Sequence, residues 1–288
     1  MLKRNLTAVV LIAVALLFIL YLRTLCVDLA DILFYAFMII GAVELWQVGK
    51  KSGYHAFLFP LLLFVTIVYP LYYFFNELGI LITLMLSVLT AMTVFLIARK
   101  KSSLNDVFYT LLILLYPLTL CTAFFVINHS AAGLLGIMFV LFVTLLSDAF
   151  ALFAGMLFGK RKLMEDVSPK KTVAGVFGAY FGGLLGATIV ILLFDIFAVF
   201  KNFGNVGIIR LFDEYYLTVP IYFATAILCT TVAIIGDLVA SLLKRKMGVK
   251  DFGKIFPGHG GVMDRMDSLL FVAPFVALLL AIYNGAVL

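Results

Sequence analysis

Long runs of apolar residues, separated by short polar breaks, follow one another along the whole chain. Most runs have about the 20 residues that an α-helix needs to cross the hydrocarbon core of a membrane. They predict nine spanning helices, at residues 5–22, 29–48, 54–75, 78–98, 105–127, 131–158, 173–200, 216–243 and 266–286. The strand-like alternation of a membrane β-barrel is absent. We therefore expect an all-α, polytopic integral membrane protein with a single membrane domain over residues 1–288.

Composition supports this interpretation and excludes several classes of protein. Hydrophobic residues make up 65% of the chain and charged residues 12%, whereas soluble domains are about one half hydrophobic and one quarter charged. The mean hydropathy is +1.20. These values exclude a soluble globular enzyme, a disordered chain and a collagen-like fibre. The cysteines lie in separate apolar runs, which disfavours a disulfide framework and a zinc site.

The net charge of +6 must be located along the chain before it is assigned to a partner. Eighteen of the 21 Lys and Arg residues flank the predicted helices on one side of the membrane. This asymmetry follows the positive-inside rule and predicts a cytoplasmic N-terminus and an outward C-terminus. It also argues against a nucleic-acid partner. We expect N-terminal spans in residues 1–130 and catalytic spans in 131–288, with basic cytoplasmic loops at 159–172 and 245–265.

Several carboxylates lie within the apolar runs, where ionisable groups are costly and by default mark a functional site. Six of them lie in or beside the second, sixth, seventh and eighth predicted helices: Asp28, Asp31, Glu44, Asp148, Asp195 and Asp237. Asp28, Asp31 and Asp195 have no clustered partners in the sequence. For these three we favour a structural role, in which the carboxylate hydrogen-bonds a neighbouring helix.

A second set of carboxylates adjoins the basic loops. Asp237 precedes Lys244 by seven residues on one predicted helix. Asp264 and Asp267 are three residues apart, on one face at the start of the last helix. Neighbouring carboxylates repel one another unless a cation joins them, and Mg²⁺ is usually held by carboxylates together with substrate phosphates. Such a site with a basic rim suits phosphoryl or nucleotidyl transfer, and a structural charge network is the alternative.

A glycine-bearing run, Pro257-Gly258-His259-Gly260-Gly261, lies just before these last carboxylates. Its glycines permit a close backbone approach, and successive N–H groups can form an anion-binding nest for a phosphate. The P-loop pattern GxxxxGK[ST] is absent. The sequence leaves three roles open for His259: a structural imidazole, a phosphate donor or an acid–base group.

Residues 241–267 read SLLKRKMGVKDFGKIFPGHGGVMDRMD. This stretch resembles the C-terminal signature of phosphatidate cytidylyltransferases (CDP-diacylglycerol synthases), in which polar residues recur at fixed spacing. The matching positions are Ser241, Lys244, Arg245, Lys250, Asp251, His259, Gly260, Gly261, Asp264, Arg265 and Asp267. A second stretch also resembles the family and runs from Ser147-Asp148 through Gly159-Lys160 to Ser168-Pro169-Lys170-Lys171-Thr172.

The resemblance implies a reaction of CTP with phosphatidate that yields CDP-diacylglycerol and pyrophosphate, with Mg²⁺ and room for a second cation of unknown identity. The implied Mg²⁺ ligands are Asp237, Asp264 and Asp267, and Asp148 is implied to bind the second cation or to organise the nucleotide. The implied phosphate contacts are Lys244, Arg245, Arg265 and His259, with Lys170 and Lys171 guiding CTP. The other implied substrate-binding residues are Ser147, Lys160, Ser241, Lys250, Gly260 and Gly261.

The expected location is the cytoplasmic (inner) membrane of the cell, with the active site facing the cytoplasm and phosphatidate arriving from the membrane lipids. One alternative is another transferase of a lipid phosphate, such as a polyprenyl-phosphate enzyme or a lipid kinase. A second is an ion or anion transporter with intramembrane carboxylates, although no convincing inverted repeat is visible. The spacing of Gly178, Gly182 and Gly186 predicts close helix packing, either within one chain or in a homodimer.

Overall fold

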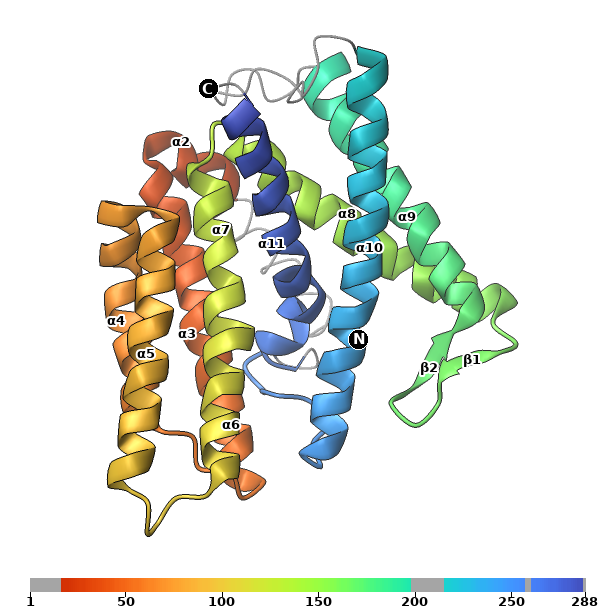
Figure 1. Ribbon diagram of the computed structural model, residues 1–288. Coiled ribbons are helices and arrows are strands. Elements are labelled where there is room, and N and C mark those ends of the chain that lie inside the picture. Colours follow the sequence, from red (N-terminus) through yellow and green to blue (C-terminus); the bar gives the residue numbers. More distant parts are fainter. Residues whose placement is uncertain (1–16, 198–214, 257–259, 287–288) are drawn as a thin grey trace. The chain divides into compact units, whose positions relative to one another are not determined.

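A computed structural model describes residues 17–197, 215–256 and 260–286 (Figure 1). In this part of the chain, eight helical stretches are long and apolar enough to cross a membrane. They are α3 (Val27–Lys51), α4 (Leu58–Phe75), α5 (Glu77–Ile97), Leu104–His129, α8 (Gly133–Phe158), Val173–Ile196, α10 (Tyr215–Lys246) and α11 (Met263–Ala286). The prediction of an all-α, polytopic membrane protein is confirmed, and these stretches agree with the predicted ones to within four residues. The predicted first helix, 5–22, lies mostly outside the described residues and is represented by η1 (Leu17–Leu22), before α2 (Arg23–Leu25).

Two of the spanning stretches contain a π-helical segment. The first comprises α6 (Leu104–Ile113), η2 (Leu114–Thr119) and α7 (Leu120–His129), and the second comprises α9 (Val173–Ile191) and η3 (Leu192–Ile196). In η2 the cause is visible in the sequence, because Pro117 has no N–H to donate to the helical ladder. The wider turn lets the chain continue as α7 without a break.

A β-hairpin occupies the basic loop 159–172, for which the sequence predicted no secondary structure. Strand β1 (Lys162–Met164) pairs antiparallel with β2 (Ser168–Thr172). The Thr172 hydroxyl then accepts a hydrogen bond of 3.1 Å from the Gly175 N–H and so caps the start of α9. Figure 1 shows the hairpin between the end of α8 and the start of α9.

The chain forms two compact units. The first contains the described residues of 32–126 and 244–266, and the second those of 13–31, 127–243 and 267–288. In the first unit, Phe34 of α3 stacks on Phe124 of α7 with ring centroids 4.8 Å apart. The buried Tyr109 hydroxyl donates to the Leu45 carbonyl oxygen at 2.6 Å, which ties α6 to α3.

In the second unit, α8 and α9 pack through glycines. A Cβ atom at Gly178, Gly182 or Gly186 would lie less than 3.0 Å from a backbone carbonyl oxygen of α8. The three oxygens belong to residues Phe150, Leu146 and Phe142. The predicted close packing at these glycines is therefore confirmed within one chain, while a homodimer stays a prediction.

Candidate active site at α10 and α11

The signature residues lie on two helices that contact one another. Lys244, near the end of α10, forms an ion pair with Asp264 in the first turn of α11, with 3.0 Å between Nζ and Oδ1. Within the second unit, Gly236 of α10 packs against the Asp267 carbonyl oxygen and the Phe271 ring of α11, so that a Cβ there would lie less than 3.0 Å from both. The structure therefore brings the α10 part of the signature beside its α11 part.

The Asp264 side chain is only 4% exposed and uses both of its oxygens. Oδ1 receives the Lys244 ammonium group. Oδ2 accepts backbone N–H groups from Phe252 at 2.8 Å, Gly261 at 3.0 Å and Gly253 at 3.4 Å. Asp264 thus binds two separate parts of the segment between α10 and α11, one at Phe252 and Gly253 and the other at Gly261.

Asp237 is partly accessible and also has a lysine partner. Its side chain is 33% exposed, and Oδ2 lies 2.7 Å from Nζ of Lys171 at the end of the hairpin. Ser241, one turn further along α10, donates a weak hydrogen bond of 3.4 Å to Oδ1. Asp237 is therefore in contact with Lys171, from the stretch 147–172, and with Ser241, from the signature 241–267.

The remaining predicted residues differ in accessibility. Ser147 of α8 is 1% exposed, and its Oγ atom has no hydrogen-bond partner among the described residues. Asp267 is partly exposed and accepts the Ser268 N–H at 2.9 Å. The exposed members of the set are Asp148, Lys160, Lys170, Arg245, Lys250 and Arg265. His259 lies outside the described residues.

Part of the predicted phosphate nest, residues 257–259, lies outside the described residues, and the last N–H group of the run, that of Gly261, is occupied by a carboxylate of the protein. Gly260 has a φ of +80°, a conformation that favours glycine. However, the Gly261 N–H donates to Asp264, and the next two N–H groups, of Val262 and Met263, donate to Glu44 of α3. A substrate phosphate at this nest would have to displace a carboxylate.

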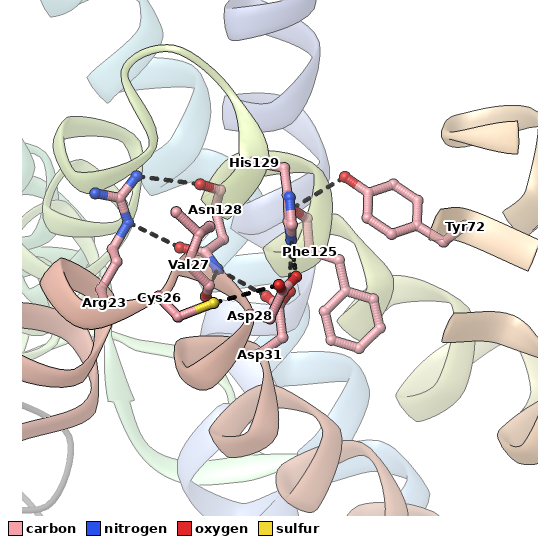
Figure 2. A network of polar contacts seen from close by, with 9 residues as sticks. All are labelled: Arg23, Cys26, Val27, Asp28, Asp31, Tyr72, Phe125, Asn128 and His129. Atoms are coloured by element: carbon pink, nitrogen blue, oxygen red, sulfur yellow. Dashed lines mark hydrogen bonds and ion pairs between the residues drawn. The ribbon is translucent and has the colours of Figure 1, made fainter. Parts of the chain in front are cut away.

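A second polar cluster lies in the second unit, at the start of α3 (Figure 2). The His129 Nε2 atom lies 2.7 Å from Oδ2 of the buried Asp31 and 3.6 Å from Oδ1 of Asp28. Asn128 donates to the other Asp31 oxygen at 2.8 Å, and Arg23 donates to the Asn128 side chain at 2.9 Å. Burial lowers the pKa of the Arg23 guanidinium group, and the Asp31 charge acts in the opposite direction.

This cluster accounts for Asp28 and Asp31, two of the carboxylates in or beside the second predicted helix. Asp28, Asp31 and His129 offer ligand atoms within 4.8 Å of one another. Their contacts form an ion-pair and hydrogen-bond network that joins the start of α3 to the end of α7. The prediction that the Asp31 carboxylate hydrogen-bonds a neighbouring helix is confirmed.

Comparison with known proteins identifies the family. The model of the Cytidylyltransferase family matches residues 2–283. The chain belongs to the cytidylyltransferase family. A phosphatidate cytidylyltransferase of Bacillus subtilis (strain 168) is 32% identical over 264 residues, which cover 88% of this chain and 89% of that protein. One of Thermotoga maritima is 34% identical over 259 residues, covering 88% and 87%. One of Haemophilus influenzae is 39% identical over 143 residues, covering 50% and 44%.

The donor atoms of this cytidylyltransferase suit a hard divalent cation. Asp237 and Asp267 present carboxylate oxygens that are partly accessible, and oxygen is the ligand that Mg²⁺ prefers. Asp237 already has a positive group at 2.7 Å, which shows that this position accepts a cationic partner. The Ser147 hydroxyl is a buried oxygen atom without a hydrogen-bond partner among the described residues, and such atoms often mark a missing water, ion or ligand.

Sequence reasoning assigned no role to Glu44, although it noted a carboxylate in the second apolar run. The position of this carboxylate within an apolar run was the signal that could have singled out Glu44. Its partners, Val262 and Met263, lie more than 200 residues further along the chain. A single sequence carries no information about that pairing.

Proposed function

We propose that this cytidylyltransferase is a phosphatidate cytidylyltransferase, which converts CTP and phosphatidate into CDP-diacylglycerol and pyrophosphate with Mg²⁺. The observation that carries this proposal is the similarity to relatives of that name over 88% of the chain. Two ion pairs of the residues singled out from the sequence support it: Lys244 with Asp264, between α10 and α11, and Lys171 with Asp237, between β2 and α10.

The reaction requires two polyanions to meet in line. A phosphate oxygen of phosphatidate, already anionic at neutral pH, attacks the α-phosphorus of CTP. The bond from that phosphorus to the bridging oxygen breaks, and pyrophosphate leaves with the electron pair. Because no proton has to be removed from the nucleophile, positioning and charge neutralisation supply most of the rate enhancement.

Three carboxylates are assigned to the divalent cation: Asp237, Asp264 and Asp267. A bound Mg²⁺ supplies neutralisation of the triphosphate charge. Lys171 and Lys244 each neutralise one of these carboxylates in the structure. From these positions, Lys171 would guide CTP and Lys244 would contact its phosphates. Asp148 is assigned to a second cation or to the nucleotide.

The other assigned residues form the approach for the nucleotide and the lipid phosphate. The side chains of Lys160, Lys170, Arg245, Lys250 and Arg265 are exposed, as groups that attract CTP from the cytoplasm must be. Further substrate contacts are assigned to Ser147, Ser241, His259, Gly260 and Gly261. Phosphatidate enters sideways from the bilayer, because its acyl chains are costly to move into water.

The test is product formation by purified protein in lipid–detergent micelles. Cytidine-labelled CTP should enter the lipid fraction only when phosphatidate and Mg²⁺ are both present, with one pyrophosphate released per lipid labelled. Labelling with a polyprenyl phosphate in place of phosphatidate would favour the other transferase class. Solute flux into liposomes without nucleotide consumption would favour a transporter.

A further inference from the structure

Glu44 is a buried carboxylate of α3 that caps the signature helix. Glu44 is 4% exposed as a residue. Its two carboxylate oxygens accept hydrogen bonds from the N–H groups of Val262 at 3.0 Å and Met263 at 2.9 Å. These groups open α11, and the first N–H groups of a helix have no partner within it. The positive end of the helix dipole also favours a carboxylate at this point.

The loop before α11 has glycines where Glu44 needs space. At Gly261, the three atoms nearest to a built Cβ all belong to the Glu44 carboxylate and lie less than 3.0 Å away. At Gly253, the two nearest atoms are also Glu44 atoms. Neither glycine has a left-handed backbone conformation. The carboxylate, and not the backbone conformation, therefore excludes a larger residue at both positions.

Two carboxylates together hold this loop by five backbone N–H groups. Glu44 takes the two that open α11, and Asp264 takes those of Phe252, Gly253 and Gly261. No Lys, Arg or His nitrogen of the described residues lies within 4.0 Å of the Glu44 carboxylate, so backbone N–H groups are its polar partners there. This geometry is typical of an anchor, since a carboxylate can accept several charge-assisted N–H bonds.

We propose that Glu44 is a positioning residue for cytidylyl transfer. It anchors the start of α11, at Val262 and Met263, to α3 and so keeps Asp264 in place for Lys244 and the cation, without contacting either substrate. This inference rests on the proposed function. If Glu44 acts only through position, its loss lowers kcat and leaves the KM for CTP almost unchanged, because the exposed basic groups that attract the nucleotide remain.

The first test is kinetic. Glu44→Ala should lower kcat by roughly 10–100-fold, the range for residues that orient metal ligands, with less than about a twofold change in the KM for CTP. Glu44→Gln keeps one acceptor oxygen for one of the two N–H groups and should give an intermediate kcat. The matched control is Glu77→Ala, which removes an exposed glutamate from the first turn of α5 and should match the wild type.

The second test does not depend on activity. Backbone amides of residues 252–256 and 260–263 should exchange with deuterated solvent faster in Glu44→Ala than in the wild type or in Glu77→Ala. Exchange in α5 should be the same in all three proteins. If Glu44→Ala folds poorly, the same comparison with Glu44→Gln applies, with a smaller increase in exchange expected.

A double variant tests the contact itself. Gly261→Ala alone should lower kcat strongly, because its methyl group would overlap the Glu44 carboxylate. In the Glu44→Ala background, Gly261→Ala should change the logarithm of kcat by less than about a third of its effect in the wild type, because the overlapping carboxylate atoms are gone. Additive losses, or unchanged exchange and turnover in Glu44→Ala, would overturn the inference. A wild-type protein without turnover would instead overturn the proposed function, and the exchange data would still test the anchoring.

Discussion

Asp264→Asn tests the centre of the proposed site. The wild-type carboxylate receives four donors, the Lys244 ammonium group on one oxygen and three backbone N–H groups on the other. An asparagine keeps the three N–H bonds only by turning its own NH₂ group toward Lys244. The variant therefore keeps the loop contacts and loses the ion pair.

The structure sets the size of the stability loss. Removing one partner of a buried ion pair costs about 3–5 kcal/mol because the other charge stays behind. The Lys244 side chain is 15% exposed and its long stem can turn toward water, so we expect about 3 kcal/mol. Domains are typically stable by about 5–15 kcal/mol, and the variant should therefore remain folded at low temperature.

Turnover should respond far more strongly than stability. We expect CTP-dependent lipid labelling to fall by at least on the order of 10³-fold, because a cation ligand is lost together with the placement of Lys244. Lipid labelling is measured at a temperature below the unfolding transition of the variant, as determined by a thermal unfolding curve. Adding Lys244→Met to Asp264→Asn should restore most of the stability without restoring turnover. Turnover near the wild-type level in Asp264→Asn would remove this residue from the site.

Two further predictions concern the second unit. Asp31→Asn removes the charge of a buried carboxylate that pairs with the partly exposed His129 and should lower the unfolding free energy by about 1–3 kcal/mol. The control Asp28→Asn, on a side chain that is 49% exposed, should cost less than about 1 kcal/mol, and equal losses in the two variants would show that the buried Asp31 carboxylate is not the stabilising member of this network. Gly182→Ala should destabilise by about 1–3 kcal/mol through overlap with α8, measured as a lower unfolding temperature against Phe181→Leu. An unchanged unfolding temperature in Gly182→Ala would show that this glycine packing is not required.

The spanning helices were readable from the sequence because lipid imposes a simple rule. A helix such as α5 (Glu77–Ile97) needs about 20 apolar residues to cross a membrane, whatever its neighbours are. The hairpin β1–β2 was missed for the opposite reason. It is short, polar and exposed, so neither hydropathy nor strand-like alternation marks it.

The site was readable as a set of residues and not as a set of contacts. Asp264 and Lys244 stood out because both fall in the 241–267 signature. Their pairing with one another, and that of Asp237 with Lys171, needed the structure. The anchoring by Glu44 was beyond the sequence altogether, since it links two helices through backbone N–H groups that no side-chain pattern records.

The most direct test of cytidylyl transfer follows two labels of CTP in one reaction with purified protein, phosphatidate and Mg²⁺. We predict that an α-phosphate label enters the lipid in equal amount to pyrophosphate released, while a γ-phosphate label appears only in pyrophosphate. A γ-phosphate label in the lipid would identify a kinase, and absence of both labels from the lipid would contradict the proposed function.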